Sequence, residues 1–335
     1  LGVTTHTLRY YEKMGLIQPE VNRETGYRYY TVTDTRRFNL CRELRAKLAL
    51  HEGVPAEQIL CGNGAADLIF RLVWAKKPRR ALVTAPTFAE YATALESVGC
   101  TVERFFLREQ EDFAVTDAFC AAIRPGVDMV FLCQPNNPTG QLTALPLVEQ
   151  ILHRCAACGT LLVVDECFLD FLPDHALHTA KGLLGEGNLV ILKAFTKLYG
   201  MAGVRLGYAL SADTALLEQM QACGQPWGVS SLAQAAGLAA LEETAYVEKV
   251  RALIAEQRPR LTAGLRALGL RVLDGRANYL LFQAPETLGE ALRQRGAVLR
   301  SCANYPGLGP GWYRTAVRTG PENEQLLKLL AEVLE

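Results

Sequence analysis

The chain has 335 residues, of which 35 are basic and 35 are acidic, so its formal net charge at pH 7 is zero. Because no overall field draws the molecule to nucleic acid or to a membrane, any basic surface must be local. Half of the residues are hydrophobic, which allows one large domain and a smaller one, and no apolar run approaches the ~20 residues that cross a bilayer.

The cysteine pattern indicates a reduced protein. Ten cysteines are scattered along the chain, without the even spacing of a secreted disulfide framework. No signal peptide opens the sequence, so the cytoplasm is the expected compartment. Cys155 and Cys158 have no second pair at zinc-site spacing. We therefore expect them to share a helix face, and we expect no metal site.

The first forty residues are rich in tyrosine and arginine. Residues 3–17 and 22–30 resemble the recognition helix and the wing of MerR-type transcription regulators. The resemblance implies that Arg9, Tyr10, Arg28 and Tyr29 lie near DNA phosphates or bases. Neither the first helix of the helix-turn-helix nor a long helix after the wing is recognised, so DNA binding is expected to be poor.

Residues 37–45 form the junction with the rest of the chain. They fit the helix that follows a regulator's wing, and they fit equally well the first helix of the region that comes next. A gene fusion and a cloning artefact would both produce such a junction.

From about residue 57 to residue 210, short apolar runs alternate with longer amphipathic ones. This pattern is typical of βα units that form a mostly parallel sheet. The expected strands are 80–84, 102–107, 129–133, 160–165, 189–194 and 205–209. A helix is expected at 145–157.

Two sequence features before and after the first of these strands could bind a ligand. Gly64, Ala65 and Ala66 lie where a glycine-containing turn opens a helix, so that free N–H groups and the helix dipole can meet a phosphate dianion. Alone, this turn is a weak indication. Phe88 follows the strand at 80–84, and an isolated phenylalanine in such a place usually belongs to the core.

Three further motifs follow strands. Asn137 lies in a turn rich in proline, which by itself predicts only a turn. Asp165 ends a strand at the edge where open α/β sheets place ligands, although an aspartate there can also cap a helix. Lys197 follows Thr196, with Arg205 eight residues later; a lysine on its own is usually a solvated surface residue.

In this order, the motifs resemble those of class I/II aminotransferases, which are pyridoxal 5′-phosphate (PLP) enzymes of fold type I. The resemblance implies an α/β fold with a mostly parallel sheet. It makes Lys197 the catalytic residue that carries the cofactor, and it pairs Asp165 with the pyridine nitrogen, which keeps the ring cationic. The other cofactor-binding residues that it implies are Gly64, Ala65, Ala66, Phe88, Asn137, Phe168, Thr196 and Arg205.

The pattern changes after residue 225. Long helices are expected at 230–241 and 244–268, strands at 271–273, 279–282, 298–301 and 313–317, and a closing helix at 322–334. This change indicates a smaller α+β domain. We therefore expect a partial MerR-like segment at 1–39, a PLP-binding large domain at 40–225 and a small C-terminal domain at 226–335.

Within the family, the chain resembles the branch that holds histidinol-phosphate aminotransferase and threonine-phosphate decarboxylase. Phe168 stands where the aminotransferases typically have a tyrosine, and it cannot hydrogen-bond the cofactor. Residues 299–308 and 313–318 resemble the C-terminal signature of the decarboxylases. Arg314 matches the arginine that binds the substrate α-carboxylate, Arg300 matches a second anion-binding arginine, and Asn137 also faces the substrate.

The resemblance implies a homodimer that decarboxylates L-threonine O-3-phosphate in cobalamin biosynthesis. An aminotransferase acting on histidinol phosphate or an aromatic amino acid remains an alternative. A PLP-sensing transcription regulator that binds DNA is the alternative of another class. The N-terminal arm of the enzyme branch, with its asparagine-rich loop and its tyrosine for the neighbouring subunit, is not recognised. Its loss predicts that activity is weak or absent even if the cofactor binds.

Overall fold

The computed structural model describes residues 9, 12, 19–29, 32–225 and 228–334, and leaves the side chains of 32–39 aside. Its contacts divide the chain into two compact units. Unit 1 contains Leu1–Lys77 and Leu192–Thr244, and unit 2 contains Pro78–Ile191 and Ala245–Glu335. The domain boundaries at 40 and 226 stay a prediction. None of the described helices is both long enough and apolar enough to pass through a membrane.

A small hairpin occupies the position predicted for the wing. β1 (Glu20–Val21) pairs antiparallel with β2 (Arg28–Tyr29). The Arg28 guanidinium contacts the carboxylate of Glu12 at 2.8 Å. Most of the predicted recognition helix, including Tyr10, lies outside the described residues.

The predicted junction at 37–45 lies inside one continuous helix, α2 (Val32–Glu52). The expectation that no long helix follows the wing is therefore wrong. Leu44 and Leu48 are buried, and their spacing of four places them on one helix face. The second half of α2 thus packs into unit 1 through this face, while the helix as a whole extends back to the hairpin.

Besides the β1–β2 hairpin, unit 1 contains the strands β3, β9 and β8, which pair in the order β3-β9-β8. β3 (Ile59–Gly62), which the sequence analysis did not predict, pairs antiparallel with β9 (Gly207–Leu210). β8 (Leu189–Ala194) enters this unit with its last three residues. The helices and turns of the unit are η1 (Ala56–Gln58), α3 (Ala65–Lys76), α7 (Phe195–Leu198), α8 (Thr214–Ala222) and α9 (Ser231–Ala240).

Unit 2 contains a sheet in the order β8-β7-β6-β4-β5, in which β4 pairs parallel with β5 and β6, and β6 pairs parallel with β7. Its strands are β4 (Arg80–Ala85), β5 (Thr101–Phe106), β6 (Met129–Cys133) and β7 (Leu161–Asp165). All residues of β6 and β7 are buried, which explains why these strands were recognisable as unbroken apolar runs.

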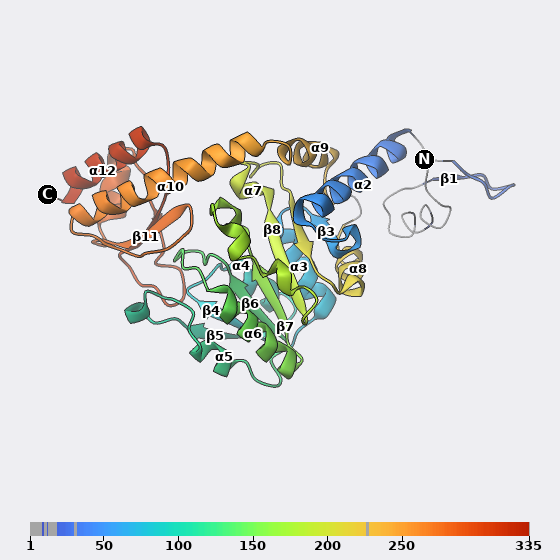
Figure 1. Ribbon diagram of the computed structural model, residues 1–335, viewed down its shortest axis with the longest axis horizontal. Helices are drawn as coiled ribbons and strands as arrows, with labels where there is room; N and C mark the ends of the chain where they lie inside the picture. Colours follow the sequence, from blue (N-terminus) through green and yellow to red (C-terminus); the bar gives the residue numbers. More distant parts are fainter. Residues whose placement is uncertain (1–8, 10–11, 13–18, 30–31, 226–227, 335) are drawn as a thin grey trace. The chain divides into compact units, whose positions relative to one another are not determined.

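Helices and short 3-10 turns accompany this sheet. α6 packs on β7 and lies beside α5 (Figure 1). The elements are α4 (Glu90–Glu96), α5 (Ala118–Ala122), α6 (Leu145–Cys158), η2 (Glu109–Glu111), η3 (Leu169–Phe171), η4 (His175–Leu177) and η5 (Ala180–Leu183).

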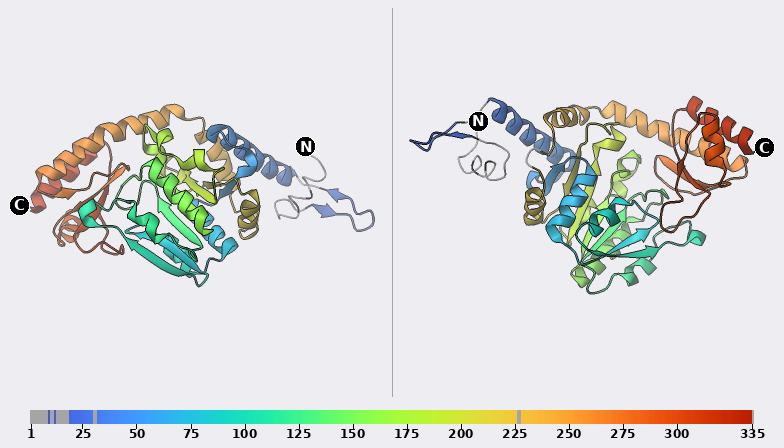
Figure 2. Two further views of the ribbon diagram at one scale, coloured as in Figure 1. Left: turned by 60° about the horizontal axis from the view of Figure 1, so that its bottom comes forward. Right: turned by 180° about the vertical axis from the view of Figure 1, so that it is seen from behind.

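The C-terminal part of unit 2 forms an antiparallel sheet in the order β10-β11-β13-β12. Its strands are β10 (Arg271–Val272), β11 (Tyr279–Gln283), β12 (Arg300–Ser301) and β13 (Trp312–Ala316). α10 (Thr244–Ala267) lies beside α12 (Gly320–Leu334) (Figure 2). The two helices pack closely at Gly264, where an added Cβ would lie 2.4 Å from the Leu327 side chain. With α11 (Leu288–Gln294), these elements confirm the predicted C-terminal pattern.

Candidate active site

A buried carboxylate lies at the end of β7. Asp165 is 5% exposed. Its Oδ2 accepts a hydrogen bond from the Tyr91 hydroxyl at 2.6 Å, and its Oδ1 accepts one from the Cys167 N–H at 3.0 Å. Burial, and then the neighbouring Asp165 charge, raise the pKa of the Tyr91 phenol well above its ordinary value. Tyr91 therefore remains a hydrogen-bond donor at neutral pH, and two donors hold the carboxylate in place.

The aromatic residues around Tyr91 fix its position. Its ring stacks on Phe131 with centroids 4.7 Å apart, and Phe88 meets it edge-on at 5.5 Å. Phe88 was predicted from the sequence, whereas Tyr91 was not. The only signal was a tyrosine one helical turn after the Pro-Thr-Phe sequence, and nothing local links it to Asp165.

We expect Tyr91→Phe to lower the free energy of unfolding by about 1.5–3 kcal/mol, since the change removes a hydrogen bond to a buried charged group and keeps the ring. Urea denaturation of the cofactor-free protein measures this. Tyr246→Phe is the matched control, because Tyr246 is 41% exposed. Equal stability of the two variants would show that the Tyr91 hydroxyl does not support Asp165.

The turn after β6 holds two asparagines with different surroundings. Asn136 is 4% exposed, donates to the Pro86 carbonyl at 2.9 Å and accepts from the Thr87 hydroxyl at 2.8 Å. Its side chain therefore fastens the turn to the end of β4. The Asn137 side-chain oxygen accepts instead from Nη1 of Arg314. Asn137 and Arg314, both predicted to bind the substrate, are therefore in contact.

Tyr279 of β11 connects the antiparallel sheet to this turn. Its hydroxyl donates to the Asn136 carbonyl at 2.9 Å. The Arg314 guanidinium lies over its ring at 5.0 Å from the centroid, and Phe168 meets the ring edge-on at 5.1 Å. Tyr279 thus positions both Arg314 and Phe168 relative to the turn, a role that the sequence analysis did not assign.

Arg300 and Arg314 are directly opposite each other in the β12–β13 pair. Directly opposed residues of antiparallel strands project from the same face of the sheet. The Arg300 guanidinium lies 5.7 Å from the Tyr305 ring centroid and donates to the Asn304 side chain at 3.2 Å. Like charges directly opposite each other destabilise a sheet. An anion that contacts both arginines therefore reduces the repulsion between them.

In unit 1, the predicted phosphate cradle is formed by the start of α3. Gly64 is the N-cap residue with φ +87°, and α3 continues for 12 residues. The Arg205 guanidinium packs on Gly64: its Nη2 lies so close that a Cβ added at Gly64 would be 2.7 Å from it. The N–H groups of Ala65 and Ala66, the helix dipole and a guanidinium thus meet at one place, which suits a phosphate dianion.

The backbone around this cradle is tightly packed, and Gly207 is the critical residue. A Cβ at Gly207 would lie 2.6 Å from the Ala65 nitrogen and 2.9 Å from the Lys193 oxygen. We expect Gly207→Ala to cost about 1–3 kcal/mol of unfolding free energy through overpacking, and to weaken cofactor binding. Thermal denaturation and cofactor titration test this.

Gly203→Ala is the control for that experiment, since nothing lies within 4 Å of a Cβ at Gly203. If the two variants bind the cofactor alike, the packing at Gly207 does not shape the cradle.

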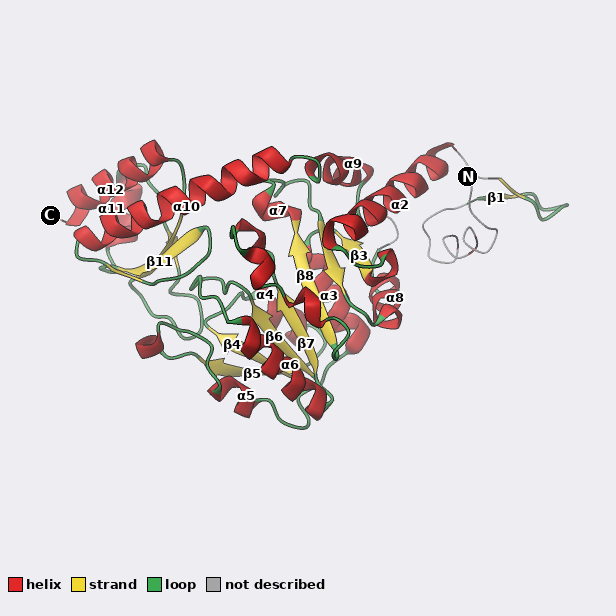
Figure 3. Cartoon of the chain, in the orientation of Figure 1, coloured by secondary structure: helices red, strands yellow, loops and turns green. Residues whose placement is uncertain are grey.

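Lys197 lies in α7, which directly follows β8 (Figure 3). It is exposed, and Thr196 beside it is 9% exposed. The helix is anchored by Phe195, whose N–H donates to the Leu206 carbonyl at 3.1 Å. Arg205, with φ +62°, turns the chain into β9, which is why β9 begins two residues later than predicted.

The structure thus groups the predicted residues within the two units. In unit 1 it brings Arg205 to the cradle, and in unit 2 it brings Arg314 to Asn137. The residues in unit 1 are Gly64, Ala65, Ala66, Thr196, Lys197 and Arg205; those in unit 2 are Phe88, Asn137, Asp165, Phe168, Arg300 and Arg314. Their individual roles stay predictions.

Potential metal ligands gather at one surface position among the described residues. Glu149, His153 and Glu186 place their ligand atoms within 4.8 Å of one another, and all three are exposed. Nothing else at this position points to an ion. Cys155 and Cys158 both lie on α6.

Each unit therefore offers groups suited to a phosphorylated pyridine cofactor: a phosphate cradle in unit 1 and a buried carboxylate for a ring nitrogen in unit 2. Residues 30–333 match the family described as aminotransferase class I and II. The chain belongs to this family, whose cofactor is PLP, as predicted. Residues 1–50 match the family described as MerR HTH family regulatory protein.

Two relatives give the degree of similarity. A threonine-phosphate decarboxylase from Salmonella typhimurium is 40% identical over 295 residues, which cover 87% of this chain and 81% of that protein. A histidinol-phosphate aminotransferase from Symbiobacterium thermophilum is 36% identical over 300 residues, which cover 88% and 81%.

Solved structures share the fold. Histidinol-phosphate aminotransferase from Clostridium acetobutylicum superposes with a TM-score of 0.81 at 24% identity, over 99% of this chain and 96% of that one. L-threonine-O-3-phosphate decarboxylase from Porphyromonas gingivalis gives 0.75 at 23% identity, over 90% and 96%. The predicted α/β fold of fold type I is confirmed.

Proposed function

We propose that the protein decarboxylates L-threonine O-3-phosphate with PLP. The observation that carries the proposal is the direct opposition of Arg300 and Arg314 in the β12–β13 pair. A substrate with an α-carboxylate and a phosphate supplies two anionic groups to two cations on one face. The similarity to the decarboxylase from Salmonella typhimurium supports this choice.

The residues of this chain fit the cofactor. Lys197 would hold it covalently, Asp165 would pair with its pyridine nitrogen, and Asn137 would meet its phenolic oxygen. Phe88 would stack on the ring, and Phe168 would lie nearby as an apolar contact. The phosphate would be held by Gly64, Ala65, Ala66, Thr196 and Arg205. When bound, PLP supplies a ring that accepts the electron pair released from the substrate α-carbon.

Arg314 would decide which bond of the α-carbon breaks, by holding the substrate carboxylate. Loss of the carboxylate releases CO₂, and a proton takes its place to give (R)-1-aminopropan-2-yl phosphate. Loss of the α-hydrogen leads instead to transamination. Arg314 is held by the Asn137 oxygen and the Tyr279 ring, so its position is set before substrate arrives.

Phe168 favours the decarboxylase within the family. Its ring packs against Tyr279 and Phe171 and offers no hydroxyl to the cofactor. An aminotransferase mechanism that relies on a tyrosine hydroxyl at this position has no such donor in this chain.

The test is to incubate the PLP-loaded protein with threonine phosphate, and to measure CO₂ and aminopropanol phosphate. Equal amounts of both products support the proposal. Transamination of histidinol phosphate without CO₂ release from threonine phosphate would overturn it in favour of the aminotransferase. We further propose that the enzyme is a cytoplasmic homodimer that serves cobalamin biosynthesis; light scattering on the purified protein tests the dimer.

A DNA-binding regulator is a second candidate, favoured by the match of residues 1–50 and by the β1–β2 hairpin. A gel shift with duplex DNA at increasing salt tests it. A shift that weakens steeply with salt supports binding through phosphates, and no shift at low salt eliminates it.

A further inference from the structure

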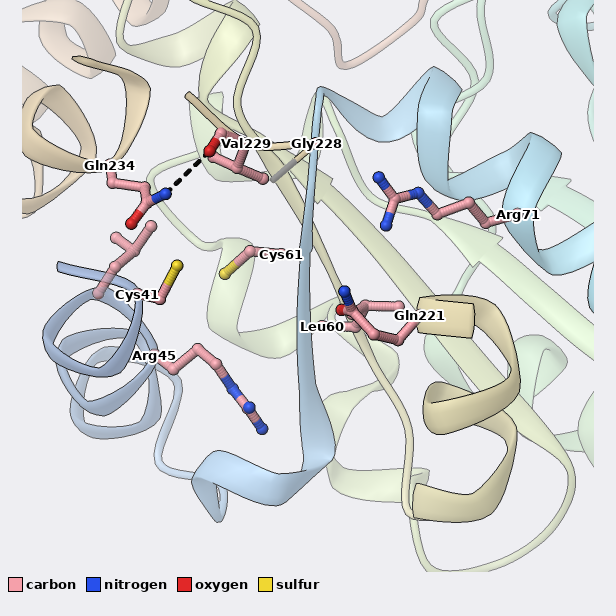
Figure 4. A pocket seen from close by; sticks show the side chains of 10 residues that line it. Cys41, Arg45, Leu60, Cys61, Arg71, Gln221, Gly228, Val229 and Gln234 are labelled. Atoms are coloured by element: carbon pink, nitrogen blue, oxygen red, sulfur yellow. Dashed lines mark hydrogen bonds between the residues drawn. The ribbon is translucent and has the colours of Figure 1, made fainter. Parts of the chain in front are cut away.

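A pocket of about 70 Å³ lies within unit 1, lined by residues of α2, β3, α3, α8 and α9 and by Gly228 and Val229 (Figure 4). A buried water needs roughly 10–15 Å³ of such space, so the pocket can hold a small ion or several waters. None of the residues predicted to bind the cofactor lines it. It is therefore separate from the cradle at Gly64.

Two buried polar atoms at this pocket lack hydrogen-bond partners among the described residues. Gln234 is 2% exposed, and its Nε2 donates to the Val229 carbonyl at 2.8 Å (Figure 4). Its Oε1 has no donor. Arg45 donates from Nη2 to the Ala56 carbonyl at 2.7 Å, but its buried Nε has no acceptor. Buried polar groups are normally paired. A ligand that accepts a hydrogen bond from Arg45 Nε and donates one to Gln234 Oε1 would pair both atoms.

The pocket also carries one uncompensated positive charge. Arg71 is bound through Nε and Nη2 to the Asp67 carboxylate, at 2.9 Å in both contacts. The same carboxylate accepts the Asn63 N–H at 2.8 Å, so the Arg71 charge is neutralised beside the cradle. Arg45 makes no ion pair with a described residue. Its charge is therefore available to an anion.

Two thiols in the wall of the pocket do not cancel that charge. Burial raises the pKa of Cys61 to about 12, and burial also raises the pKa of Cys41. The ordinary pKa of a thiol already lies above 7, and burial raises it further, so both thiols are neutral at neutral pH and no thiolate repels an anion.

We propose that this pocket binds a small oxyanion that still carries a proton, of the class of inorganic phosphate or a phosphate monoester. One anion oxygen accepts from Arg45 Nε, and the protonated oxygen donates to Gln234 Oε1. Sulfate has the same shape and a negative charge, but it carries no proton at neutral pH. It therefore leaves the Gln234 oxygen unpaired, at the cost of a lost hydrogen bond to a buried group.

The experiment uses the PLP-loaded protein, so that the cofactor's own phosphate occupies the cradle, and titrates it calorimetrically with phosphate or with sulfate at slightly acidic pH. We expect phosphate to bind, and sulfate to bind weaker by about tenfold or more. Arg45→Met should lose phosphate binding. Gln234→Met should bring the ratio of the two affinities close to one, because the acceptor that distinguishes the ions is gone.

Arg42→Met is the matched control, since Arg42 is exposed on the same helix and does not line the pocket; it should bind phosphate like the parent protein. Arg45→Lys, which keeps the charge, is added in case Arg45→Met fails to fold, and it should also bind phosphate weaker by about tenfold, because it lacks Nε. Methyl phosphate tests the source: binding as tight as that of phosphate assigns the pocket to monoesters, and weaker binding assigns it to free phosphate.

Three outcomes would overturn the proposal. They are the absence of phosphate binding, equal affinity for sulfate in the parent protein, and phosphate binding that Arg45→Met leaves intact but Arg205→Met abolishes. The last result would place the ion in the cofactor cradle. The readout does not depend on decarboxylation, so it stands whether or not the proposed activity is found.

Discussion

Replacing Lys197 by alanine is expected to remove the visible absorbance that PLP acquires when it is attached to the protein, and to lower turnover of threonine phosphate by about 10²–10⁴-fold. The first effect follows because the lysine amine is the proposed point of attachment. The expected loss of turnover equals the contribution of a positioned side chain that transfers protons. Absorbance spectra and CO₂ release measure the two effects on one sample.

Lys249→Ala is the control, because Lys249 is exposed on α10 and far in sequence from every proposed site residue. Borohydride reduction followed by peptide mass spectrometry should place the cofactor on the peptide that contains Lys197. Cofactor found on another peptide, or a Lys197→Ala protein that keeps its absorbance, would contradict the assignment.

The parallel sheet was predictable because its strands carry their own signal. Buried parallel strands such as β6 and β7 are apolar at every position, and only their ends differ from expectation. β3 was missed, since Ile59–Gly62 is a run of four residues that depends on pairing with β9. The length of α2 was also predicted wrongly, because its first residues belong to the N-terminal segment that is rich in tyrosine and arginine and lacks a strand–helix alternation.

The site was predictable wherever function rests on a local motif. Asp165 and Lys197 each follow a strand in a recognisable sequence. Tyr91 and Tyr279 act through partners 74 and 143 residues away, at Asp165 and Asn136. A single sequence holds no signal for such pairings, because they depend on how distant segments pack.

The opposition of Arg300 and Arg314 is a matter of strand register. Shifting one strand by a single residue would move its side chains to the other face of the sheet. Both arginines were predicted from the sequence to bind anions, but only the pairing of β12 with β13 places them opposite each other. The register is therefore what turns two separate arginines into a site for a substrate with two anionic groups.

Arg314→Met is accordingly expected to reduce kcat/KM for threonine phosphate by about 10²–10³-fold, which corresponds to ~3–4 kcal/mol of lost transition-state stabilisation from one partner of a charged pair. Arg314→Lys should recover only part of the loss, because an ammonium cannot pair with a carboxylate through two parallel hydrogen bonds. Steady-state kinetics with threonine phosphate measure both variants.

Arg318→Met is the matched control, since Arg318 is an exposed arginine near the same strand that pairs with Glu322 at 2.7 Å. It should leave kcat/KM nearly unchanged. If Arg314 holds the carboxylate, its loss must also change the fate of the substrate that still reacts, and CO₂ release should fall relative to transamination. A loss of activity with an unchanged product ratio would mean that Arg314 binds the substrate without choosing the bond that breaks.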